Sequence, residues 1–194
     1  MKIIREITFQ EMLRRFAIGE VFSDFYRAPS NESRNETLQL LESGKHSQET
    51  EGIERVLSGR HFLVKSLPQE TKWYLAKLPI TLDNFLAIQT INDSGWVNHS
   101  GGTQKLIDAA INLRDAPGKD IRVDSIVSAF KQGNVEMRGI TLMGQSENGP
   151  YTIAEGNGRL VAVYLCCVDE QSSPICKSEI EVVLGTTEIR WNFR

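Results

Sequence analysis

The sequence predicts an α+β fold, in which a single domain has a small mixed sheet packed by helices. Three observations favour this class. The chain has 194 residues and 40% hydrophobic content, which is enough for one sizeable core. Apolar residues at helical spacing alternate along the chain with short runs rich in β-branched and aromatic side chains. Residues 120–185 then show a helix, a hairpin, a second helix and a last strand in succession.

The first half of the chain, residues 1–118, is predicted to be mainly helical. Residues 2–7 alternate like a short strand, after which Thr8 can cap a helix that we expect to end at Gly19. Residues 29–52 are dominated by Ser, Asn, Glu, Gln and Thr. Because only the cluster of Leu38, Leu40 and Leu41 is present to be buried, we expect a mobile surface excursion there, with at most one set of helical turns.

Three more elements complete this half. Residues 73–78 favour a strand rich in aromatic and apolar side chains, and Thr81 caps a helix predicted over 82–91. A further helix is predicted over 106–114, and the Pro-Gly pair that follows stops it. We expect this half to pack on a core formed by residues 119–194.

The second half carries the sharper pattern. Asp124 or Ser125 caps a helix that Gly133 ends. Asn148-Gly149, within the connecting segment 145–150, indicates a hairpin, because both residues tolerate positive φ. The two hairpin strands, the next helix and the last strand are predicted over 140–143, 151–154, 160–168 and 179–184.

Composition and charge narrow the class of partner. The net charge is −3 and neither half is basic: residues 1–118 carry 14 basic and 15 acidic groups, and residues 119–194 carry 8 and 10. Because duplex binding depends on many Lys and Arg contacts to phosphates, this balance disfavours DNA as a partner. No apolar run approaches the ~20 residues that cross a bilayer, so we expect no membrane insertion and a cytoplasmic protein.

Cysteines and histidines indicate neither a disulfide framework nor a metal site. Cys166, Cys167 and Cys176 are odd in number and crowded into one region, so we expect reduced thiols packed in the core. The histidines lack the spacing that puts two metal ligands on one helix face. A metal site is therefore not predicted.

A five-residue loop, Glu-Gly-Asn-Gly-Arg, follows the second hairpin strand and is the candidate functional site. Unpaired N–H groups at such a strand-to-helix junction favour an anion. Gly156 and Gly158 permit positive φ and close approach of a phosphate or carboxylate, and Arg159 adds a planar cationic fork. Asn157 either caps the helix or orients a polar ligand group, and Glu155 is the candidate catalytic carboxylate. A structural alternative stays open, in which Arg159 pairs with Glu155 only to pin the turn.

The loop at 98–105 is a second candidate, because it carries two glycines and opens a helix. It lacks P-loop spacing, and a Ser- or Thr-capped helix start is the simpler interpretation. Its candidate ligand contacts are His99 and Lys105. Candidate stacking platforms for a ligand ring, with burial in the core as the alternative, are Trp73, Tyr74 and Trp96.

The order of elements over 124–184 resembles the ParB/sulfiredoxin-like superfamily. That pattern is a helix ending in Gly, a strand, a hairpin, a second strand, Gly-x-His/Arg-Arg-Leu-x-Ala, a helix and a final strand. Residues 156–162 read Gly-Asn-Gly-Arg-Leu-Val-Ala. The resemblance implies a nucleotide- or phosphate-facing loop, with Gly156 and Arg159 at the phosphate-binding positions. The candidate cofactor is a nucleotide with Mg²⁺.

Departures from that pattern leave the reaction open. Asn157 stands where sulfiredoxins have their catalytic Cys, and Gly158 stands where a His or Arg is usual. The loop also resembles the Fic-type nucleotidyl transferase motif, but Tyr151 replaces its catalytic His and Ala162 its second Arg. We therefore expect a small phosphate-bearing ligand or a protein partner at the loop. The protein is then either a nucleotide-dependent enzyme or switch, or a non-catalytic interaction module with the same fold.

Overall fold

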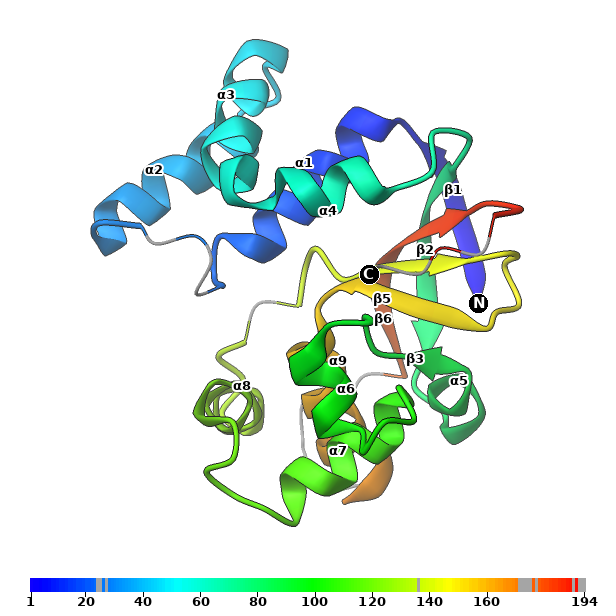
Figure 1. The fold of residues 1–194 in the computed structure, drawn as a ribbon. Coiled ribbons are helices and arrows are strands. Elements are labelled where there is room, and N and C mark those ends of the chain that lie inside the picture. The colour runs from blue at the N-terminus through cyan, green and yellow to red at the C-terminus, as the bar shows by residue number, and fades with distance from the viewer. Residues whose placement is uncertain are drawn as a thin grey trace.

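The computed structural model describes residues 1–23, 26, 28–135, 137–170, 176, 178–189 and 191. It confirms the α+β class: helices pack on a mixed sheet in a single domain (Figure 1). The strands of the sheet are β1 Lys2–Ile7, β2 Lys72–Pro79, β3 Ile88–Gln89, β4 Thr141–Gly144, β5 Tyr151–Glu155 and β6 Glu179–Thr186.

The sheet has the order β1-β2-β6-β4-β5-β3. β1 with β2, β2 with β6, and β4 with β5 are antiparallel pairs, whereas β4 with β6 and β3 with β5 are parallel. In the register of the long central pair, Tyr74 lies opposite Leu184. Strands from the first 118 residues therefore extend the sheet on both of its edges, and one sheet runs across the boundary expected at residue 118.

The N-terminal helices are α1 Phe9–Glu20, α2 Asn31–Leu41, α3 His46–Leu57, the 3-10 turn η1 Ser58–Arg60, and α4 His61–Ser66. Thr8 caps α1 as predicted, since its hydroxyl accepts a hydrogen bond of 3.1 Å from the N–H of Glu11. α1 continues one residue beyond Gly19, to Glu20.

The expectation of a mobile excursion over 29–52 was wrong, because α2 and α3 occupy that segment. The few apolar side chains there are enough to dock both helices. Leu41 is fully buried, and Gly52 lets α3 approach it so closely that a Cβ would lie 2.9 Å from Leu41 Cγ. Ile53 is buried in the same cluster. Tertiary packing here outweighs a composition that favours disorder.

The remaining helices are α5 Leu82–Leu86, α6 Ser94–His99, α7 Leu106–Arg114, α8 Ile121–Lys131, α9 Asn157–Val163 and the π-helix η2 Tyr164–Asp169. In Figure 1, α1 to α4 lie at the top of the view and α6 to α9 at the bottom, with the sheet to the right of both groups.

Three predicted helix boundaries were wrong. The helix expected over 82–91 ends at Leu86, because the chain turns into β3 and pairs with β5. The helix expected from Asp124 or Ser125 begins at Ile121, because Asp120 is the cap and its carboxylate accepts a 3.1 Å hydrogen bond from Val123 N–H. The helix expected over 160–168 begins at Asn157 and widens into a π-helix.

A close backbone crossing fixes the end of α1 against the second half of the chain. Gly139 has φ +80°, and a Cβ at this position would lie 2.5 Å from the carbonyl oxygen of Arg15 and 2.6 Å from the nitrogen of Gly19. Only a residue without a side chain permits this approach. The crossing brings the last residue of α1, Glu20, to the junction of β5 and α9.

The cysteines differ from the expectation of reduced thiols. Cys167 at the end of the apolar helix is bonded to Cys176, with the two Cα atoms 5.4 Å apart, and Cys166 is a buried thiol. The sequence spacing did not indicate this pair, because it leaves open which of the two adjacent cysteines bonds to Cys176. No helix within the described ranges is long and apolar enough to cross a membrane.

Candidate functional site

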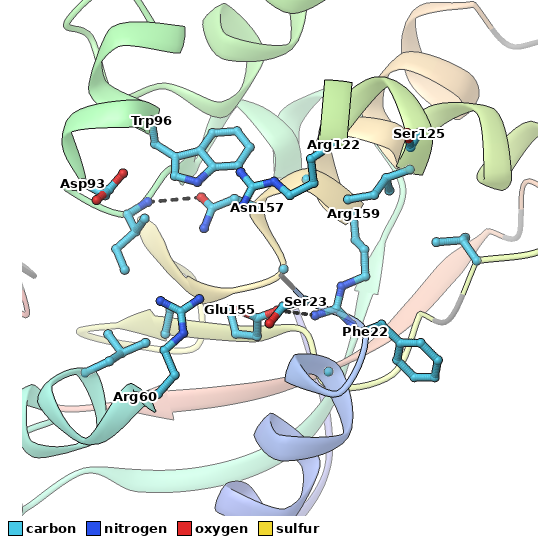
Figure 2. A pocket seen from close by; sticks show the side chains of 18 of the residues that line it. Phe22, Ser23, Arg60, Asp93, Trp96, Arg122, Ser125, Glu155, Asn157 and Arg159 are labelled. Atoms are coloured by element: carbon cyan, nitrogen blue, oxygen red, sulfur yellow. Dashed lines mark hydrogen bonds and ion pairs between the residues drawn. The ribbon is translucent and has the colours of Figure 1, made fainter. Parts of the chain in front are cut away.

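A pocket of about 830 Å³ lies between the N-terminal helices and α6 and α8, with the junction of β5 and α9 as its base. All five residues of the 155–159 loop line it. Figure 2 shows Arg60 entering the pocket from the bottom of the view, and Trp96 and Arg122 from the top. The structure thus places the predicted loop against a cavity large enough for a small-molecule ligand.

Within the loop, Arg159 is engaged by neighbouring residues. Its Nη2 lies 2.6 Å from Glu155 Oε1, and its Nη1 donates to the carbonyl oxygen of Arg138. The side chains of Arg159 and Glu155 are only 9% and 14% exposed. The pairing proposed as a structural alternative is therefore present, and it coexists with the pocket.

The two glycines of the loop are explained by close packing. Gly156 has φ +99°, and a Cβ there would lie 3.0 Å from Ile140 Cγ1. A Cβ on Gly158 would lie 2.9 Å from Ile126 Cδ1 of α8. Both glycines are needed to bring α9 against its neighbours, with or without a ligand.

Asn157 does not cap α9. Its side-chain oxygen instead accepts a hydrogen bond of 3.2 Å from the buried N–H of Ile91, in the link between β3 and α6. This bond fastens the α6 wall of the pocket to its base.

The base of the pocket includes a cluster of buried charges that sequence reasoning missed. Glu20 is fully buried, its Oε1 lies 2.8 Å from Arg60 Nη2, and Ser23 Oγ donates to its Oε2. Glu20 also lies close enough to Glu155 for its negative charge to raise the pKa of that carboxyl. One sequence signal could have found it: Glu20 continues the buried face of α1 at the spacing of Met12 and Phe16.

These surroundings change the protonation of Glu155. Burial of its carboxyl raises its pKa, and the negative charge of Glu20 raises it further. The Arg159 guanidinium lowers it, but only in part, so that the pKa of Glu155 is raised to about 8. At neutral pH this shift favours the protonated form of the Glu155 carboxyl, which can donate a proton, and a catalytic role for Glu155 stays a prediction.

The opposite wall is formed by α6 and α8. Trp96 is buried with its ring beneath Arg122, whose guanidinium carbon lies 6.0 Å from the ring centroid. Among the candidate stacking platforms, Trp96 lines the pocket, whereas Trp73 is buried in β2 with its ring 6.3 Å from that of Phe9.

The second candidate loop does not reach the pocket. His99 Nε2 lies 3.1 Å from Asp120 Oδ2, which ties the end of α6 to the start of α8. Burial would raise the pKa of Asp120, but the N–H of Val123, the Arg122 charge and His99 outweigh it and lower the pKa. Lys105 is exposed, and neither His99 nor Lys105 lines the pocket. A ligand role for these two residues stays a prediction.

Within the described part of the chain, no cluster of three or more His, Cys, Asp or Glu side chains could hold a metal ion.

The net charge of the pocket depends on the protonation of Glu155. With Glu155 protonated, three cations face two anions at the pocket and its base, so an anionic ligand is favoured. The cations are Arg60, Arg122 and Arg159, and the anions are Asp93 and Glu20.

Comparisons of the chain with protein-family models, with curated proteins and with solved structures found no match. Function is therefore argued from the chemistry of the pocket.

Proposed function

We propose that this protein binds a nucleotide or another phosphate-bearing ligand in the pocket above the 155–159 loop. The observation that carries the proposal is the convergence of three arginines on one cavity. Arg60, Arg122 and Arg159 come from η1, α8 and α9, and all three line the same space. Guanidinium groups are well suited to phosphate oxygens, because their planar N–H pairs match them.

The walls of the pocket supply the second requirement of a nucleotide, an apolar surface for its ring. Phe22 and Phe62 line the pocket and are 49% and 53% exposed, so their faces are accessible. About 830 Å³ lies within the range of about 300 to 1,000 Å³ that is usual for small-molecule sites. An aromatic rim over a cationic base suits a ligand with a flat ring and a phosphate.

The resemblance to the ParB/sulfiredoxin-like superfamily supports the same proposal. The elements α8, β4, β5, the 155–159 loop, α9 and β6 follow one another in the order of that pattern. Membership in that superfamily is part of the proposal. Nucleotide binding at this loop is what it implies.

The arginines have different tasks. Arg122 is the least buried of the three, with a side chain 39% exposed and a contact of 3.5 Å to Asp120, so it is the first to meet a phosphate. Arg159 is paired with Glu155 and contributes mainly to the positive electrostatic potential at the base of the pocket.

We do not propose turnover. The Fic-type alternative is not carried further, because Tyr151, at its His position, is buried with its hydroxyl donating to the carbonyl of Glu147.

A second candidate function is a protein-interaction module. Phe22 and Phe62 are joined at the pocket by Ile121, which is 74% exposed, and such an apolar rim also suits a peptide segment.

A thermal-shift screen of nucleotides, with and without Mg²⁺, tests the proposal. A ligand at about 100 times its dissociation constant stabilises the fold by about 2.7 kcal/mol. We expect such a shift in the wild type and in the control Arg55→Ala, which removes an exposed arginine of α3. Arg122→Ala and Arg159→Ala should weaken binding at least about tenfold, the effect of losing ~1.4 kcal/mol. No shift with any nucleotide at millimolar concentration refutes the proposal, and a shift unaffected by both pocket variants places the ligand elsewhere.

A further inference from the structure

The side-chain amide of Asn157 is held at the base of the pocket by its oxygen, while its nitrogen stays unpaired. Asn157 lines the pocket and is only 8% exposed. Its oxygen accepts the hydrogen bond of 3.2 Å from Ile91 N–H. Among the residues that the structure describes, no group accepts a hydrogen bond from its nitrogen, Nδ2. Figure 2 shows Asn157 between Trp96 and Glu155, with the amide nitrogen turned into the cavity.

The bond to Ile91 fixes which end of the amide faces the pocket. A backbone N–H needs an acceptor, and only the oxygen of an amide side chain accepts, so a flipped Asn157 would set two donors against each other. The pocket therefore meets an NH2 group, which donates hydrogen bonds and cannot accept them. An aspartate would also accept the bond from Ile91. The amide of Asn157 thus supplies a donor that the bond to Ile91 does not require.

The packing of α9 on α8 brings a second donor to this part of the pocket. A Cβ on Gly158 would lie 2.9 Å from Ile126 Cδ1, so the first turn of α9 rests on Ile126. Arg122 precedes Ile126 by one helical turn and lies on the same face of α8. Arg122 also lines the pocket, and its contact of 3.5 Å with Asp120 is long for a hydrogen bond. It therefore keeps N–H groups for a ligand where the α8 wall meets the base.

We propose that Asn157 is a specificity-determining residue, whose amide NH2 and the Arg122 guanidinium together donate to one oxyanion of the ligand, a phosphate or a carboxylate. This inference rests on the proposed function for the ligand as a whole, and it assigns the anionic end of that ligand to the corner between α8 and α9. Both groups are donors only, so a ligand group that must itself donate, such as an ammonium, finds no acceptor in them. The ring of the ligand is left to the rim of Phe22 and Phe62.

Proton–nitrogen NMR of the wild type observes the Asn157 side-chain NH2 directly, with its resonances assigned through bonds from its own backbone. The probes are ATP, pyrophosphate and malonate at neutral pH. We expect the Asn157 NH2 resonances to shift saturably, whereas those of Asn148, exposed in the β4–β5 hairpin, should not move. Binding of ATP that leaves the Asn157 NH2 unmoved overturns the inference and leaves the proposed function standing. If malonate moves these resonances and no phosphate compound binds, the oxyanion site stands and the proposed function fails. If no probe moves them, the inference is overturned.

Asn157→Asp separates the bond to Ile91 from the contact with the ligand, because it keeps the acceptor oxygen and replaces the donor with a negatively charged oxygen. Its affinity for the probe that moves the Asn157 resonances, measured by calorimetry, should fall about tenfold to about a hundredfold, since a hydrogen bond to a charged group is lost and like charges meet. The matched control Asn148→Asp makes the same change of charge at an exposed position and should bind as the wild type does. Wild-type affinity in Asn157→Asp overturns the inference. If Asn157→Asp does not fold, the NMR titration of the wild type decides alone.

Discussion

The raised pKa of Glu155 predicts how the stability of the protein depends on pH. The perturbation is Glu155→Gln, which keeps the size of the side chain and removes its titration. The pKa of Glu155 is raised from 4.5 to about 8 in the folded protein. Between these values the folded chain binds one proton more than the unfolded chain, so its stability falls as the pH rises.

The magnitude follows from the same interval. Each pKa unit corresponds to about 1.4 kcal/mol, so the free energy of unfolding should fall by at most about 5 kcal/mol between about pH 4.5 and about pH 8. The contribution is complete below the lower value and is lost above the upper one. Glu11 and Asp120 have lowered pKa values, so their stabilisation is lost only in more acidic solution. The interval from about pH 5 to about pH 8 therefore isolates Glu155 from the other shifted carboxyls.

Urea unfolding at several pH values from about 5 to about 9 measures this dependence. The wild type and the control Glu147→Gln, at an exposed position of the β4–β5 hairpin, should lose up to about 1.4 kcal/mol per pH unit and then level off, and Glu155→Gln should show a much smaller slope. A wild-type stability that is constant or rising over this interval refutes the reasoning. So does a Glu155→Gln variant with the same slope as the wild type.

Three further predictions concern packing and are measured by the same unfolding assay. Gly139→Ala should lower the free energy of unfolding by about 3 kcal/mol or more, because its Cβ would meet backbone atoms within 2.7 Å. The control Gly118→Ala, also at positive φ but with nothing within 4 Å of its Cβ, should lower it by only about 1 to 2 kcal/mol. Equal losses in the two variants contradict the crossing. Asn157→Ala should cost about 1 to 3 kcal/mol, because it leaves a buried N–H without its acceptor, and a neutral substitution contradicts that bond. Reduction of Cys167–Cys176 should cost up to about 2.5 kcal/mol for its nine-residue separation, and a reductant should not affect Cys176→Ser.

Local signals predicted much of the fold. The helix after Thr8 and the strand β2 follow from a cap and an apolar pattern within a few residues. The β4–β5 hairpin was also predicted, although residues 145–150 separate its strands and, of the expected turn pair, Gly149 has a positive φ and Asn148 does not. The helices α2 and α3 could not be predicted this way. Their stability depends on burying Leu41 against distant parts of the chain, and that burial is invisible in a local composition of polar residues.

The candidate site was likewise predicted only in part from the sequence. The 155–159 loop was identified from its local sequence alone, because two glycines, an asparagine and an arginine lie together there. Glu20 and Arg60 were not found, since each is an ordinary charged residue in its local context. They become part of the site only through the crossing of α1 over Gly139 and the packing of η1 beside the pocket.

The most direct test of the central claim is to follow the indole N–H resonance of Trp96 by NMR while ATP is added at neutral pH. Trp96 lines the pocket, whereas Trp73 and Trp191 do not and serve as internal controls. The Trp96 resonance, assigned by Trp96→Phe, should shift saturably, and the shift should weaken in Arg122→Ala. A Trp96 resonance that stays unmoved at millimolar ATP, or that moves no more than the other two indoles, contradicts phosphate-ligand binding in this pocket.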